Sequence, residues 1–304
     1  MSLKEKIEAI LEEADIKAGI AVWHIESGEK TDVNGDVPYP MASTFKIPIL
    51  ATAMKQVSQG KLSLGTRYPL KEEDKSPGSG ILPYFEGGLE PTFLDMLTLM
   101  IIISDNTATD MIIDILGGPE AIESYMHELG LNDIYIKMNC KDLIGEMFPP
   151  EVQAMPMEER MAWASTHDIL RDSRTFSLTP DNDISTALDM NSLLHMIYQG
   201  ELFGGEELET ALGILFKQQF NVRMTRFFPP QIKVAHKTGT IGGIRNDSGI
   251  IYIDDNNHVI LTEFVEWNQA PIWDQAEAQH QRVFEVETAM GKIGQLVLET
   301  YQPK

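Results

Sequence analysis

The chain has 304 residues, of which 43% are hydrophobic and 23% are charged, so it can bury a sizeable core as one large domain or two interleaved subdomains. Its 46 acidic and 24 basic side chains give a formal net charge of −22, which disfavours binding to nucleic acid and to anionic membranes. The single cysteine, Cys140, excludes an internal disulfide and a cysteine-based zinc site, and we expect a buried, unreactive thiol.

Neither a membrane span nor a signal peptide is predicted. A span needs about 18 apolar residues, whereas the longest apolar run, residues 100–103, stops at Ser104. The first residues run straight into an amphipathic pattern that lacks the apolar stretch of a leader. We therefore expect a soluble chain. The sequence leaves the compartment open: we expect the periplasm or the extracellular space if a signal peptide was removed, and the cytoplasm otherwise.

The first half of the chain is mainly helical in pattern. Apolar residues at helical spacing predict a surface helix over residues 3–14, and the β-branched and aromatic run 19–27 predicts a strand. Residues 44–59 read as a largely apolar helix, residues 92–116 as one or two buried helices, and residues 120–129 as a further helix.

The second half returns to strands after a long irregular segment. Residues 132–183 contain several prolines and little clean periodicity, whereas 187–198 and 206–218 have helical patterns. Strand patterns follow at residues 232–235, 249–253 and 258–264, and a long helix is predicted over 274–301. Because strands lie at both ends, we expect one sheet that closes around a helical insert. This gives an α/β subdomain over residues 1–40 and 205–304 and a helical subdomain over 41–204.

A Ser-x-x-Lys motif, Ser43 to Lys46, stands at the start of the first apolar helix. At positions i and i+3 the two side chains share a face, so a lysine with a lowered pKa can act as the base for the hydroxyl. The helix N-terminus can also stabilise an oxyanion formed at the serine. Taken alone, the motif equally describes a capping serine with a solvated lysine.

Two further polar segments interrupt apolar surroundings. Ser104-Asp105-Asn106 ends a buried helical stretch, where a hydroxyl can pass on a proton and an asparagine can bind a substrate amide. Lys237-Thr238-Gly239 follows a predicted strand, where the lysine supplies positive charge and the glycine admits a substrate backbone. Taken singly, these segments also read as an interhelix turn and as an ordinary edge-strand lysine before a turn.

Together, and in this order, the three segments resemble the motifs of the serine hydrolases of the β-lactamase and penicillin-binding protein superfamily. The Ser-Asp-Asn form, and Arg245 beyond Lys237, resemble the class A branch. The resemblance extends loosely over residues 18–300 and is vague between 130 and 180. It implies an α/β fold of the β-lactamase/transpeptidase type, in which helices flank an antiparallel sheet built from both chain ends, with a mostly helical subdomain.

The resemblance also implies roles for individual residues. Ser43 is the acylated nucleophile, Lys46 its base or part of the proton relay, and Ser104 the proton shuttle to the leaving group. Lys237 supplies the electrostatics that lower the pKa values of the lysine and the serine.

The remaining implied roles concern substrate binding. Asn106 binds the substrate side-chain amide, and Thr238 and Arg245 hold its carboxylate. The N–H groups of Ser43 and Thr240 form the oxyanion hole.

One part of the class A pattern is missing, because no Glu-x-x-x-Asn occurs between residues 140 and 185. Acids that could replace this deacylating glutamate, or be ordinary solvated side chains, are Asp168, Asp172, Asp181 and Asp183. We therefore expect a class A-like serine hydrolase of β-lactams or related amides and esters. A penicillin-binding sensor that acylates without efficient turnover, or a carboxylesterase, is the alternative. No cofactor is expected, the seven histidines show no metal spacing, and the oligomeric state is left open.

Overall fold

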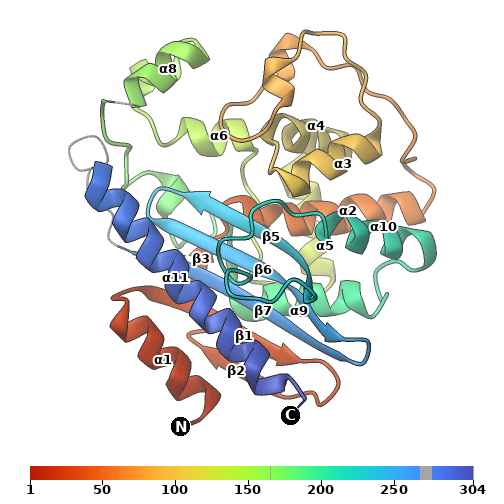
Figure 1. Ribbon diagram of the computed structural model, residues 1–304. Coiled ribbons are helices and arrows are strands. Elements are labelled where there is room, and N and C mark those ends of the chain that lie inside the picture. The colour runs from red at the N-terminus through yellow and green to blue at the C-terminus, as the bar shows by residue number, and fades with distance from the viewer. Residues whose placement is uncertain (165, 268–275, 304) are drawn as a thin grey trace.

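Strands from both ends of the chain form one antiparallel sheet in the computed structural model, which describes residues 1–164, 166–267 and 276–303 (Figure 1). The strand order is β2-β1-β7-β6-β5, and every neighbouring pair is antiparallel. The bounds are β1 Lys17–His24, β2 Lys30–Val33, β5 Lys233–Ile241, β6 Ile244–Asp254 and β7 Asn257–Glu266. The mixed fold predicted from the sequence, with a sheet built from both chain ends and flanked by helices, is confirmed.

The two terminal helices cover one face of this sheet (Figure 1). Helix α1 (Leu3–Glu13) begins at a capping box, in which Ser2 and Glu5 satisfy each other's backbone N–H groups. Helix α11 (Ala276–Tyr301) packs beside α1 and buries Met290, Ile293 and Val297 in the same cluster. Both helices match the predicted ones closely. Among the described helices, none is both long and apolar enough to cross a membrane.

A second core fills the space between the other sheet face and the remaining long helices. Helix α9 (Ala187–Tyr198) packs on β1, β6 and β7, and α2 (Lys46–Ser58) packs against α10 (Gly205–Leu215). Helix α2 is buried almost all round over its first nine residues, which is why its pattern reads as apolar and not amphipathic.

The buried stretch predicted as one or two helices is two. Helix α3 (Phe93–Ile102) ends before Ser104, and α4 (Asn106–Leu116) begins at once, with Asp105 as its N-cap accepting from the N–H of Ala108 at 2.9 Å. Helix α4 ends at Gly117 in the left-handed conformation, and α5 (Pro119–Glu128) follows.

The irregular middle segment holds short elements that the sequence did not predict. These are α6 Cys140–Gly145, α7 Pro150–Gln153, α8 Met157–Ala164, the 3-10 helix η4 Arg174–Phe176 and β4 Ile184–Thr186. Strand β4 pairs with β3 (Pro38–Pro40), which leads directly into the Ser43 turn. Strands of three residues are too short to show an alternating pattern. The subdomain boundaries expected at residues 40 and 204 stay a prediction.

Candidate active site

Ser43 lies in a tight turn whose backbone is fixed from several sides. The turn is the 3-10 helix η1 (Ala42–Phe45), and Ala42 before the serine has a φ of 45°, a conformation that non-glycine residues rarely adopt. The N–H of Met41 donates to the Asp183 carbonyl at 2.9 Å, and the Thr44 hydroxyl donates to the Met41 carbonyl at 2.7 Å. Strained backbone of this kind persists only where its surroundings over-determine it.

The ammonium of Lys46 joins the first two sequence motifs. It donates to the Ser104 carbonyl at 2.8 Å, to the Ser104 hydroxyl at 3.0 Å and to Oδ1 of Asn106 at 2.7 Å. The lysine is fully buried, and burial lowers its pKa because the charged form loses its water. The structure therefore brings Lys46, Ser104 and Asn106 into one hydrogen-bonded group. Lys46 follows Ser43 by three residues, about one helical turn.

The Ser104-Asp105-Asn106 segment is held in place by the loop in front of it. Oδ2 of the buried Asp105 accepts from the N–H groups of Ile81 and Leu82 at 2.7 and 2.9 Å, while Asn106 donates from Nδ2 to the Pro77 carbonyl at 2.8 Å. Ser104 itself has a φ of 60°. These contacts fix the side chains that face Lys46.

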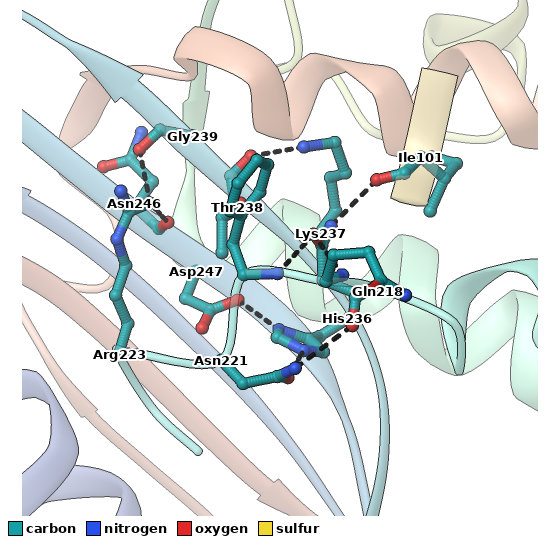
Figure 2. Close-up of polar contacts among 12 residues, drawn as sticks. Ile101, Gln218, Asn221, Arg223, His236, Lys237, Thr238, Gly239, Asn246 and Asp247 are labelled. Atoms are coloured by element: carbon teal, nitrogen blue, oxygen red, sulfur yellow. Dashed lines mark hydrogen bonds and ion pairs between the residues drawn. The ribbon is translucent and has the colours of Figure 1, made fainter. Parts of the chain in front are cut away.

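Strand β5 forms the opposite side of the site, and its Lys237 is also fully buried (Figure 2). Its ammonium donates to the Thr238 carbonyl at 2.7 Å. Burial lowers the pKa of Lys237 well below its ordinary value, and the positive charges of Lys46 and Arg223 act in the same direction. From the sequence we expect Lys237 to carry a fixed positive charge, but its surroundings favour the neutral form. The protonation states of Lys46 and Lys237 are therefore linked.

Arg223 is a functional candidate that no sequence motif marked (Figure 2). It comes from the irregular segment after α10 and is 5% exposed. Its guanidinium donates to the carbonyls of Gly239 at 2.8 Å and Asn246 at 2.7 Å, and to the Thr240 hydroxyl at 2.5 Å. Only the tertiary contact to β5 shows that this arginine borders the site.

Arg245 lies on β6 opposite Thr240, but its guanidinium is engaged elsewhere. Its Nε lies 3.5 Å from the Glu287 carboxylate, and its guanidinium stands 5.0 Å from the centre of the Trp267 ring. Burial lowers the pKa of Arg245 to about 10. Its expected role in holding a substrate carboxylate stays a prediction. Arg223 contacts the same Glu287 carboxylate, with 3.4 Å between Nε and Oε1, so the two arginines share one acidic partner.

A buried polar layer lies beneath β5. His236 is held between Asp247, 2.8 Å from Nδ1, and Asn221, 3.1 Å from Nε2 (Figure 2). Asp247 is the cross-strand partner of Glu263 on β7, and both side chains are fully buried. Burial, with the neighbouring Asp247 charge, raises the pKa of Glu263 well above its ordinary value.

A cavity of about 310 Å³ opens beside Ser43. Ser43, Asn106 and Thr240 line it together with Cys140, whose backbone N–H donates to Oδ1 of Asp110 at 2.7 Å. The thiol is buried, as predicted, and its pKa is raised well above the ordinary value by burial and by the Asp110 charge. A thiol in this state is neither a base nor a nucleophile at neutral pH.

The four acids expected as substitutes for the deacylating glutamate lie away from this cavity. Asp168 is 3.6 Å from Arg171, Asp172 and Asp181 are exposed, and the buried Asp183 accepts from two backbone N–H groups through Oδ1. The described lining of the cavity holds no carboxylate. Within residues 1–164, 166–267 and 276–303, no group of three His, Cys, Asp or Glu side chains is arranged to hold a metal ion.

Comparisons with known proteins find relatives over most of the chain. A family model described as "Beta-lactamase enzyme family" matches residues 2–301. The chain is 24% identical to the beta-lactamase VEB-1 of Pseudomonas aeruginosa over 277 residues, which cover 87% of this chain and 82% of VEB-1. It is also 24% identical to the extended-spectrum beta-lactamase PER-1 of the same organism, over 87% of this chain and 79% of PER-1.

Solved structures share the fold over almost the whole chain. A beta-lactamase from Sphaerobacter thermophilus superimposes with a TM-score of 0.77 at 26% identity, covering 98% of this chain and 97% of that one. PBP-A superimposes with a TM-score of 0.77 at 24% identity, covering 98% and 95%. A variant of PBP-A has been solved as an acyl-enzyme complex with penicillin G.

Proposed function

Because this chain belongs to the beta-lactamase enzyme family, we propose that it is a class A-type serine enzyme that opens β-lactam amides through an ester on Ser43. The observation that carries the proposal is the buried Lys46, hydrogen-bonded to both the Ser104 hydroxyl and Asn106 and placed one turn from the serine. A buried lysine with a lowered pKa is a suitable base for a hydroxyl nucleophile.

The acylation step follows from these contacts. Neutral Lys46 takes the proton of Ser43 as its Oγ attacks the lactam carbonyl, and the negative charge on the carbonyl oxygen is stabilised by the N–H groups of Ser43 and Thr240. The Ser104 hydroxyl, 3.0 Å from Lys46, then passes its proton to the ring nitrogen and takes up the proton held by Lys46, which becomes neutral again. The carbon–nitrogen bond breaks, the ester on Ser43 remains, and the leaving nitrogen has gained one proton for the one that Ser43 lost.

Substrate binding uses the β5 side of the site. Thr238 and Thr240 offer hydroxyls toward a substrate carboxylate, and Arg223, hydrogen-bonded to Thr240, provides a guanidinium behind them. Asn106 has both ends of its amide engaged, by Lys46 and by the Pro77 carbonyl, so it holds the Ser104 segment in place as well as bordering the substrate.

Deacylation is the slow step of this proposal. An activated water needs a general base near the ester, and the described cavity wall offers the protonated thiol of Cys140 in place of a carboxylate. The same observation favours a second candidate function, a β-lactam-binding protein that acylates once and keeps the adduct.

A chromogenic cephalosporin separates the two functions. Product released is compared with the acylated protein measured by mass spectrometry, and turnover well above one equivalent supports the hydrolase, whereas one equivalent with a stable adduct supports the binding protein. Ser43→Ala is expected to abolish covalent labelling by a penicillin. Labelling that survives at another serine would refute the mechanism, and hydrolysis of simple esters without any reaction with β-lactams would make the protein a carboxylesterase.

A further inference from the structure

We propose that the cavity beside Ser43 selects substrates with an uncharged, apolar acyl side chain, an inference that rests on the proposed acylation of Ser43. The cavity of about 310 Å³ is at the small end of ligand pockets, which typically span about 300–1,000 Å³. Ser43, Asn106 and Thr240 line it, so it is continuous with the reacting groups.

Apart from Ser79 and the thiol of Cys140, the rest of the described lining is apolar. Leu143, Ile144, Met147 and Phe148 contribute one wall, and Phe45 and Ile241 contribute further apolar surface. None of the described lining residues is an Asp, Glu, Lys or Arg. A charged substrate side chain placed here would lose its hydration without gaining a counter-ion, which is unfavourable. Transfer of an aromatic or aliphatic group from water into the cavity is favourable.

The apolar wall is held in shape by contacts behind it. The Leu143 carbonyl accepts from the Thr175 hydroxyl at 2.8 Å, and the Met147 carbonyl accepts from the N–H of Leu170 at 2.9 Å. The Phe148 ring packs edge-on against the ring of Trp163, with 6.0 Å between the centroids. A wall supported in this way is preorganised. It can discriminate between substrates because its shape does not change to fit each one.

The orientation of the acyl group follows from the lining of the cavity, which has the reacting groups on one part and the apolar wall on the other. When the lactam carbonyl is directed to the N–H groups of Ser43 and Thr240, we place the acyl side chain, which the neighbouring ring carbon carries, against the apolar wall. Met147 is the residue of choice for a test, because it lines the cavity and is only half-buried, so a charged replacement keeps some contact with water.

The test measures second-order acylation rates by mass spectrometry with three penicillins whose side chains differ in charge: benzylpenicillin, carboxybenzylpenicillin and aminobenzylpenicillin. Wild type is expected to react about 10-fold or more faster with the benzyl compound than with either charged one. Met147→Lys shifts this preference toward the carboxylate and Met147→Glu toward the amine, while Met147→Leu and the exposed Glu151→Gln keep it. Equal rates for the three compounds in wild type, or a preference that ignores the charge at position 147, would overturn the inference.

A non-covalent measurement keeps this inference separate from the proposed function. If no penicillin acylates the protein, the proposed function fails. The cavity is then tested by calorimetric titration with phenylacetamide, which is apolar and unreactive. Binding to wild type that weakens about 10-fold in Met147→Lys supports the apolar cavity. No binding, or equal binding to both proteins, overturns it.

Discussion

Gly239 and Ser43 are in direct contact through their backbones. A Cβ atom added to Gly239 would lie 3.2 Å from the backbone nitrogen of Ser43, 3.1 Å from that of Thr44 and 2.6 Å from the Met41 carbonyl oxygen. Only glycine therefore lets β5 approach the nucleophile turn so closely. The contact places Thr240, the next residue on β5, beside Ser43, and so brings both proposed oxyanion donors together.

Gly239→Ala is expected to separate β5 from the Ser43 turn and to slow acylation by a penicillin by about 10²–10³-fold, the effect of losing one oxyanion donor. The rate is measured by mass spectrometry, with circular dichroism to confirm folding. Gly213→Ala is the matched control, because a Cβ there meets no atom within 4 Å. Acylation of Gly239→Ala at the wild-type rate would show that the close approach is dispensable.

The burial of Lys46 predicts a pH dependence of acylation. Since Lys46 must be neutral to act as a base and burial lowers its pKa, the rate rises with pH and levels off below 10.5. Lys237→Ala is expected to slow acylation by about 10²–10³-fold at neutral pH, because it removes a preorganised polar group of the site. It is expected to leave the inflection in place, because burial of Lys46, and not Lys237, lowers the pKa of Lys46. Lys233→Ala, at the exposed end of the same strand, is the control. An inflection that moves in Lys237→Ala would contradict burial as the cause of the lowered pKa of Lys46.

Cys140→Asp is expected to shorten the lifetime of the acyl adduct by roughly 10²-fold, because a carboxylate at this position of the cavity can activate a water. The decay of the adduct is followed by mass spectrometry. Cys140→Ser, which adds no base of comparable strength, keeps the wild-type lifetime. The aspartate also lowers stability, since it lies beside the Asp110 charge. An adduct as long-lived in the aspartate variant as in the serine variant would argue against a missing base as the cause of slow deacylation.

Glu263→Gln is expected to change how stability depends on pH. The raised pKa keeps Glu263 protonated in the folded state, while the unfolded chain loses this proton above about 4.5. The contribution of Glu263 to the free energy of unfolding is thus complete below pH 4.5 and falls by up to about 1.4 kcal/mol per pH unit above it. Glutamine removes this loss, so the stability of the variant relative to wild type increases with pH.

Chemical denaturation at several pH values measures this difference. The exposed Glu299→Gln removes one negative charge without burial and serves as the control. A constant difference between Glu263→Gln and wild type across the pH range would show that Glu263 titrates as an ordinary glutamate.

The sequence predicted the elements that are amphipathic or continuously apolar over several residues. Helix α9 has the predicted bounds, and the sheet contains the predicted strands. Strands β5, β6 and β7 run further than their apolar patterns, whereas β1 begins before residue 19 and ends at His24, short of the predicted end at residue 27. Polar residues at the active-site end of β5, such as Lys237 and Thr238, are buried against other parts of the site and so break the alternation that marks a strand. Strands β2 and β3 are too short for any pattern.

By itself, the sequence also determined the three motifs, since each joins a characteristic set of side chains over a few residues. Only the tertiary structure decided which other side chains lie next to the three motifs. Arg223 reaches Thr240 from an irregular segment, Cys140 and an apolar wall stand where a deacylating acid was expected, and Arg245 turns to Glu287. The physical reason is that local patterns record whether a side chain is buried, whereas its partner is chosen by chain segments far away in the sequence that pack against it.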